Sequence, residues 1–173
     1  MGIDNVAHDA TGLRIGIVAA RWNAALVEPM LASAVEELRR LGTAAVRVIR
    51  VPGAFELPYG AKCLMADGDC DAIVALGAVV RGDTPHFDFV AGECARGIAR
   101  LNLSWSHDWR GSRPQPGPPV IFGVLTTDTV GQAEERADPE RMDKGAEAAR
   151  SAVEMARLRR NCADDIAEFE ETP

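Results

Sequence analysis

Four short apolar runs, each followed by a segment with helical periodicity, constrain the fold of this chain more than any other feature. The runs are rich in Ile and Val, as buried strands are, and span residues 13–20, 45–52, 70–80 and 118–127. Apolar residues recur every three or four positions, as in amphipathic helices, in segments 23–42, 57–66, 87–101, 129–137 and 142–160. This alternation predicts an α/β fold: a mainly parallel sheet with helices on both faces.

The length of the chain, 173 residues, suits one well-packed domain and is too short for two ordinary ones. We therefore expect a single domain over residues 1–173, with an N-terminal arm at 1–11, a long surface loop at 102–119 and an acidic, fraying tail at 161–173. Trp105 and Trp109 would pin the loop either onto the body or onto a neighbouring subunit. The first residues match neither a secretory nor a transit leader, so we expect a cytoplasmic location.

The composition argues against several classes of partner. A net charge of −7 disfavours general binding to nucleic acid or to an anionic membrane, because both need a basic surface. No apolar run approaches the roughly 20 residues that a membrane helix needs. A zinc site or disulfide framework is also disfavoured, since no C-x-x-C pair occurs, and reduced core thiols are expected at Cys63, Cys70, Cys94 and Cys162.

The loops at the carboxyl ends of the predicted strands are where an open parallel sheet binds its ligands. That rule selects four segments, ARWN, VPGAFEL, VRGDTPHF and FGVLTTD. His86 lies in the third of them, just where a helix is predicted to begin. Histidine suits proton transfer near neutral pH, although a histidine at this place often does no more than hydrogen-bond a loop.

The chain resembles the 6,7-dimethyl-8-ribityllumazine synthase family in five strings, GIVAARWN, VPGAFELP, GAVVRGDTPHFDFV, FGVLTTDTVGQAEERA and DKGAEAARSAVEMA. The resemblance implies a three-layer sandwich with a flavodoxin-like, four-stranded parallel sheet. It also implies a step of riboflavin biosynthesis that needs no metal or redox cofactor. In that step 5-amino-6-(D-ribitylamino)uracil and 3,4-dihydroxy-2-butanone 4-phosphate condense to 6,7-dimethyl-8-ribityllumazine, releasing phosphate and water. Family members are homopentamers or multiples of pentamers, so we expect a homo-oligomer with sites between neighbours.

Side chains in the first two loops suit a flat ligand that carries a polyol. Trp22 matches a family aromatic that stacks on the pyrimidine ring, a contact worth about 1 to 3 kcal/mol by analogy with bases on aromatics. Asn23 offers both donor and acceptor, and Gly53 lets backbone approach a ligand. Phe55 can form an apolar wall and Glu56 can accept from ribityl hydroxyls. Taken alone, a tryptophan such as Trp22 is more often plain packing, and a glutamate such as Glu56 is as often a solvated helix-start carboxylate as a ligand-binding one.

The resemblance places His86 at the family's catalytic histidine, which moves protons during imine formation, phosphate loss and ring closure. Arg136 and Lys144 match two cationic positions that bind phosphate, and Phe122 matches a residue that closes the pocket from the adjacent subunit. Segment 137–145 lacks the glycine-rich run that family members often show there. The other expected substrate-binding residues are Ala54, Ala78, Val79, Val80, Asp83, whose carboxylate is expected to point away from phosphate, and Thr84.

Two other functions stay open at this level. An archaeal-type riboflavin synthase shares the fold and handles the same lumazine. A non-catalytic lumazine- or flavin-binding shell protein would have kept the fold without turnover. The presence of His86, Arg136 and Lys144 favours an enzyme over the second alternative.

Overall fold

The computed structural model describes residues 8–106 and 115–170. Its main sheet is parallel, with strand order β2-β1-β3-β6. The strands are β1 (Arg14–Ala20), β2 (Ala45–Val51), β3 (Ala72–Val80) and β6 (Val120–Thr127). Each lies within two residues of the apolar run that predicted it.

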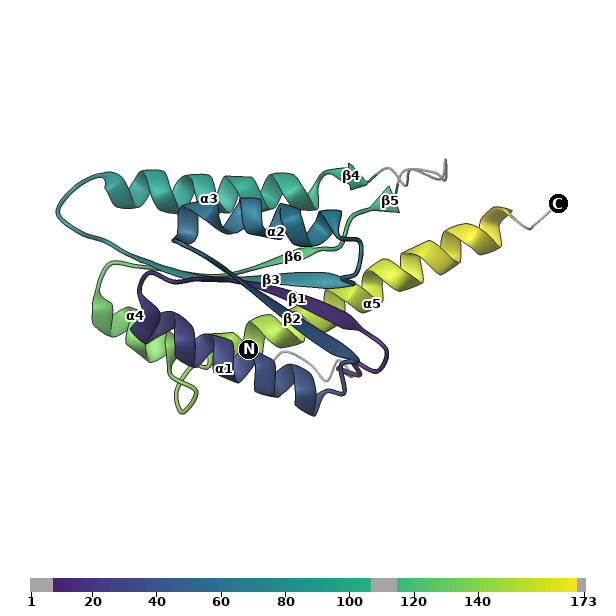
Figure 1. Cartoon of the computed structure of the whole chain (residues 1–173), viewed down its shortest axis with the longest axis horizontal. Coiled ribbons are helices and arrows are strands. Elements are labelled where there is room, and N and C mark those ends of the chain that lie inside the picture. The colour runs from purple at the N-terminus through teal and green to yellow at the C-terminus, as the bar shows by residue number, and fades with distance from the viewer. Residues whose placement is uncertain (1–7, 107–114, 171–173) are drawn as a thin grey trace.

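Helices cover both faces of this sheet and give the three layers of Figure 1. One face is covered by α1 (Ala24–Arg40), α4 (Val130–Ala137) and α5 (Lys144–Glu170). The other is covered by the short helix η1 (Ala54–Glu56), α2 (Leu57–Ala66) and α3 (His86–Asn102). The predicted fold class, an α/β three-layer sandwich with a flavodoxin-like parallel sheet, is confirmed.

The hydrophobic core has two halves because successive strand residues point to opposite faces. In β1, Ile15 and Ile17 pack under α1 and α5, whereas Val18 packs under α2. Burying a side chain of this size stabilises the fold by about 1.5 to 3 kcal/mol. β3 is buried over almost its whole length, which is why it reads as a continuous apolar run.

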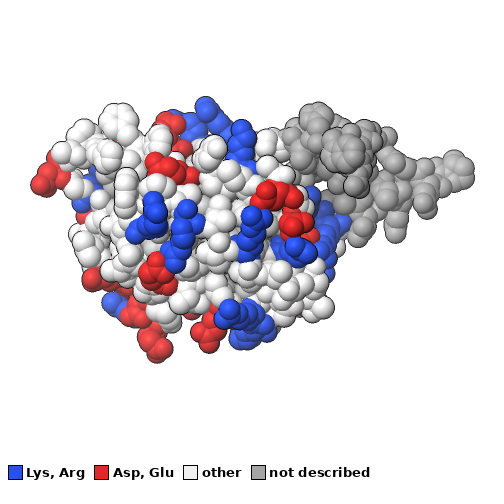
Figure 2. Space-filling view, viewed as in Figure 1, with Lys and Arg blue, Asp and Glu red and all other residues white. Residues whose placement is uncertain are grey.

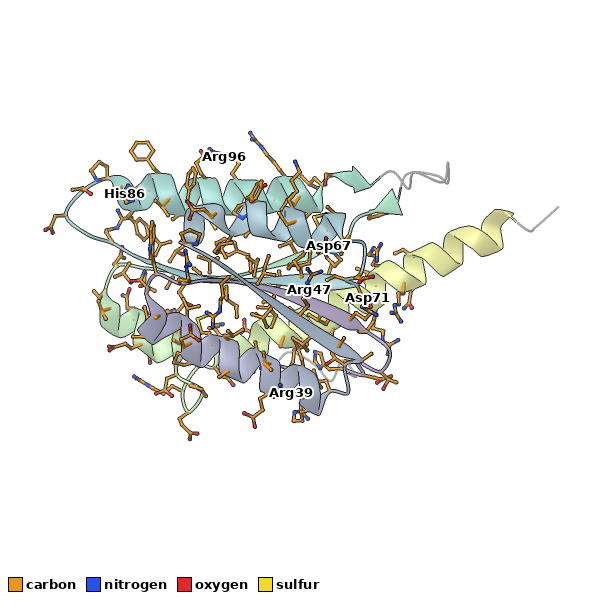
Figure 3. All side chains as sticks on the ribbon, in the orientation of Figure 1. Arg39, Arg47, Asp67, Asp71, His86 and Arg96 are labelled. Carbon is orange, nitrogen blue, oxygen red and sulfur yellow. The ribbon has the colours of Figure 1, made fainter. Side chains whose placement is uncertain are left out.

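The β2 edge of the sheet carries two ion pairs. At the β2 edge, Arg47 pairs with Asp67 (Figure 3) and Arg50 with Glu28, so charged side chains cover that edge.

On the face seen in Figure 2, basic and acidic side chains are interspersed and do not gather into one basic area. No helix among the described residues is both long and apolar enough to cross a membrane.

The structure describes parts of the predicted arm, loop and tail. In the arm, Arg157 of α5 holds the Asp9 carbonyl with its Nε at 2.9 Å. The base of the expected loop forms a small antiparallel pair, β4 (Trp105–Ser106) with β5 (Gln115–Pro116). Helix α5 continues to Glu170 through most of the expected tail. Residues 1–7, 107–114 with Trp109, and 171–173 lie outside the described residues.

The cysteine prediction was correct for two residues and wrong for two. Cys70 and Cys94 are free, buried thiols, and burial raises the pKa of Cys94 to about 11. Cys63 and Cys162 are free but exposed, because their positions on α2 and α5 face away from the core. No group of three or more His, Cys, Asp or Glu side chains in the described ranges is arranged to hold a metal.

Glu37 on α1 joins this helix to α5. Its carboxylate accepts hydrogen bonds from Arg40 at 2.7 and 2.9 Å and from Arg150 at 3.0 Å, and its side chain is only 10% exposed. The bond from Arg40 is the largest influence on its pKa, and together with Arg150 it outweighs burial, which acts in the opposite direction. The pKa of Glu37 therefore falls from 4.5 to about 2.

Replacing Glu37 by glutamine should lower the free energy of unfolding by roughly 2 kcal/mol at pH 7. A depressed carboxyl pKa contributes stability that is present above about 4.5 and is lost as the pH falls towards about 2. Urea unfolding from pH 7 to pH 3 should show that loss in the wild type and a flatter profile in Glu37→Gln. The exposed neighbour Glu36→Gln is the matched control, and an identical pH profile in all three proteins would contradict the assignment.

Candidate active site

The loops after β1, β2 and β3 are tied together at the carboxyl edge of the sheet. The backbone N–H of Trp22 donates to the carbonyl of Pro52 at 2.9 Å, which joins the first loop to the second. Nδ2 of Asn23 donates to the carbonyl of Ala78 at 2.8 Å, which joins the first loop to β3. Asn23 has a left-handed backbone, a conformation that asparagine tolerates better than most residues. Its amide was predicted to serve a ligand, and in the structure its donor group holds the edge together.

Trp22 and Gly53 form a close contact. A Cβ atom at Gly53 would overlap the indole ring, so only glycine lets Trp22 lie there. The glycine was predicted to admit a ligand, and the structure shows that it admits the tryptophan ring. Trp22 is 64% exposed and Phe55 is 55% exposed. Two aromatic rings are therefore open to a flat ligand at this edge.

Glu56 lies beside them with one carboxylate oxygen occupied. Its Oε2 accepts a hydrogen bond from the backbone N–H of Gly53 at 2.9 Å, and its side chain is partly buried. This bond closes the start of the short helix η1. Oε1 makes no hydrogen bond among the described residues, which leaves an acceptor free for a hydroxyl.

Three predicted binding residues at this edge can act only through their backbone. Ala54, Ala78 and Val79 are 6%, 5% and 9% exposed, so their side chains belong to the core. Val80 is partly buried. The carbonyl of Ala78 is already used by Asn23.

His86 is the first residue of α3 and is exposed (Figure 3). Its imidazole makes no hydrogen bond or ion pair within the described ranges. Asp83 and Thr84 are also exposed, in the loop before α3. Asp88, two residues after the histidine, bonds to Arg81 at 3.1 and 3.4 Å. The histidine therefore stands free at the tip of a helix, with its neighbouring carboxylate engaged elsewhere.

A second group of predicted residues lines a groove of about 300 Å³ along the free edge of β6. Phe122, Arg136 and Lys144 all face this groove, and the Phe122 ring is 41% exposed. Nη1 of Arg136 donates to the carbonyl of Gln132 at 2.9 Å, and the other donors of the guanidinium make no hydrogen bond to any residue that the structure describes. Lys144 donates to Glu147 at 2.5 Å. The groove thus combines an aromatic ring with two cations and one carboxylate.

The two groups of site residues stay apart within one chain. His86 begins a helix on one face of the sheet, whereas Arg136 and Lys144 belong to helices on the other face (Figure 1). None of the residues around Trp22 lines the groove. Within the described residues, no hydrogen bond or ion pair links the predicted residues of one group directly to those of the other.

Sequence reasoning missed two residues at these sites. Glu147 pairs with Lys144 and lines the groove, and its position three residues further along one helix was a signal that could have found it. Arg81 lies inside a quoted string, but its partners come from two separate places, Asp88 from the first turn of α3 and Asp128 from the loop after β6. No local spacing reveals the second of these partners.

Comparison with known families gives one match. A family model described as 6,7-dimethyl-8-ribityllumazine synthase matches residues 12–160 of the chain. The matched range contains the whole parallel sheet and every residue placed in the two groups above. It ends within α5, ten residues before the last residue of that helix.

Proposed function

The chain belongs to the 6,7-dimethyl-8-ribityllumazine synthase family, and from this premise we propose that it catalyses the condensation of 5-amino-6-(D-ribitylamino)uracil with 3,4-dihydroxy-2-butanone 4-phosphate. The product is 6,7-dimethyl-8-ribityllumazine, and phosphate and water are released. The observation that carries this proposal is the β6 groove, where Arg136 and Lys144 stand together beside an aromatic ring in a protein of net charge −7. A local pair of cations is what a phosphorylated substrate needs from an acidic protein.

The edge that carries Trp22 supplies what the uracil substrate needs. The exposed indole ring can stack on the pyrimidine. The free Oε1 of Glu56 can accept a hydrogen bond from the ribityl chain. Phosphate and pyrimidine are thus recognised by different groups of residues.

His86 is the proposed proton carrier. Imine formation, loss of phosphate and ring closure each require a proton to move, and histidine does this near neutral pH. The imidazole is exposed and makes no hydrogen bond within the described residues, so it is available to a bound substrate. Holding the two substrates side by side contributes to the rate independently of proton transfer.

We propose that one complete site forms between two copies of the chain. Each copy would contribute its Trp22 and His86 edge to one neighbour and its β6 groove to the other. This head-to-tail contact uses different surfaces on the two partners and closes into a ring, for which we propose a pentamer or a multiple of pentamers. A solution mass near that of one subunit, 18.5 kDa, would contradict the shared site.

Mixing two impaired variants, His86→Ala and Arg136→Ala, should raise activity once the subunits have been dissociated and reassembled together, when the assay is run with the phosphorylated ketone well below the KM of Arg136→Ala. In an equal random mixture, about a quarter of shared sites receive both native residues. The measurement is the specific activity of the mixture against each variant taken through the same treatment alone. A site contained within one chain would show no recovery.

The direct test of the function is turnover by the purified protein. Absorbance and fluorescence of the lumazine should appear when both precursors are supplied, faster than their uncatalysed reaction. Riboflavin formed from the lumazine alone would instead identify a riboflavin synthase. Binding of the lumazine without either reaction would identify a non-catalytic binding protein.

A further inference from the structure

Arg81, the first residue after β3, bridges two carboxylates, one in the first turn of α3 and one in the loop after β6. Its Nε donates to Oδ1 of Asp128 at 2.9 Å, and Nη2 and Nη1 donate to the two oxygens of Asp88 at 3.1 and 3.4 Å. The guanidinium carbon lies 4.1 Å from the centre of the Phe87 ring. The backbone N–H of Arg81 donates to the carbonyl of Thr127 at 2.9 Å. The Arg81 residue is therefore fixed by its backbone hydrogen bond, by the stacked Phe87 ring and by the two carboxylates.

The Asp128 side of this bridge is anchored in turn to α4. The backbone N–H of Asp128 donates to Oε1 of Gln132 at 3.0 Å, and the N–H of Gln132 donates to Oγ1 of Thr129 at 3.2 Å. Arg136 donates to the carbonyl of the same Gln132. A continuous set of contacts thus runs from the first turn of α3, through Arg81, to the helix that carries Arg136.

The loop at 82–85 has little else to hold it. Its residues are exposed, and a side chain added at Gly82 would meet no atom within 4 Å. Among the described residues, the only hydrogen bond from this loop is the local one from the N–H of Asp88 to the carbonyl of Pro85. Phe87 and Val90 pack against the core beneath α3, and the Arg81 contacts add a polar tether between the body and the first turn of that helix.

An exposed ion pair by itself contributes little to global stability, because solvent screens the two charges. Arg81 is 42% exposed and Asp88 59% exposed, so a large effect on unfolding is not expected. A two-pronged contact on a stacked guanidinium restricts geometry more than it adds stability. The contact therefore acts locally, because it restricts the position and the direction in which α3 begins.

We infer that Arg81 is a positioning residue, which sets the first turn of α3, and with it the His86 imidazole, by holding Asp88 against Asp128. Asp88 acts on the guanidinium and not on the imidazole. The kinetic part of this inference rests on the proposed function. The structural part, the order of the first turn of α3, does not.

The kinetic test compares Arg81→Gln with Arg96→Gln. Arg96 lies further along the same helix, in an exposed pair with Glu93 that has no contact with the loop (Figure 3). Arg81→Gln should lower kcat by about tenfold, since small misplacements of reacting groups are costly, and should leave KM for both substrates within about twofold. Arg81→Lys should recover only part of the loss, because a point charge cannot bridge two carboxylates in a fixed plane. Wild-type kcat in Arg81→Gln, or an equal loss in Arg96→Gln, overturns the inference.

A double-mutant cycle separates the two possible roles of Asp88. If Asp88 acts through Arg81, adding Asp88→Asn to the Arg81→Gln variant should change kcat by less than about twofold. If Asp88 orients His86 directly, the second substitution should lower kcat again by a similar factor. That second outcome overturns the role assigned to Arg81.

Hydrogen exchange provides a readout that needs no substrate. Backbone amides of residues 86–90 should exchange faster in Arg81→Gln than in the wild type, and at the wild-type rate in Arg96→Gln. Faster exchange in a protein that fails the turnover test would leave the positioning role standing and reject the proposed function. Unchanged exchange in Arg81→Gln would reject the positioning role, whatever the kinetics show.

Discussion

Replacing His86 by alanine should lower kcat of the condensation about 10²- to 10⁴-fold, the usual contribution of a positioned general acid or base. KM for both substrates should change little, because the imidazole is exposed at the tip of α3 and the proposed recognition groups lie elsewhere. The measurement is steady-state kinetics from pH 6 to pH 8. A residual rate above that in water is expected, since the site still holds the two substrates together.

The matched control for this prediction is His8→Ala. His8 lies before β1, outside both groups of site residues, and is described by the structure as partly buried. It should keep wild-type kcat. Full kcat in His86→Ala across the same pH range would show that another group moves the protons.

Replacing Arg136 by alanine should raise KM for 3,4-dihydroxy-2-butanone 4-phosphate about 10- to 100-fold, which is the loss of one or two hydrogen bonds to a charged group. KM for the uracil substrate should change much less, because that substrate carries no phosphate. Arg136→Lys should recover part of the loss, since a lysine gives charge without the two-pronged geometry. Varying the concentration of one substrate while the other is saturating measures the two KM values separately.

Arg141→Ala is the control for this change. Arg141 lies five residues further along, pairs with Glu135 in solvent and does not line the β6 groove. It should leave both KM values unchanged. A similar rise in KM for both substrates in Arg136→Ala would point to a role for Arg136 in folding of α4 and not in phosphate recognition.

The helical and strand elements could be predicted because their signals are local. The apolar run at 70–80 predicts β3, and Thr129 predicts the start of α4, where its hydroxyl accepts from the N–H of Gln132. At the start of α5 the carboxylate of Asp143 accepts from the N–H of Ala146 at 3.2 Å, which is the contact of a capping residue. The end of α5 was placed about ten residues too early, because the acidic segment at 161–170 carries turn-forming Asp and Asn that helices tolerate when the preceding turns are already formed.

The sequence nominates candidate site residues but does not predict how their side chains are arranged. The rule that ligands bind at the carboxyl ends of parallel strands selected the loops of Trp22, Glu56 and His86 before any coordinates were known. That rule cannot say which side chains meet. Gly53 was assigned to a ligand, and the structure gives that space to the ring of Trp22, thirty-one positions earlier in the chain.

The sequence by itself determined the order of strands and helices and the parallel sheet. Each follows from the spacing of apolar residues and from chain connectivity, and both can be recognised from residues that lie close together in the sequence. Only the tertiary structure decided the strand order β2-β1-β3-β6, which leaves the β6 edge open as a groove. It also decided that Arg81 meets Asp128 and that Glu37 meets Arg150, pairs separated by 47 and 113 positions. Such contacts depend on how whole elements cross and pack, and a local pattern carries no information about them.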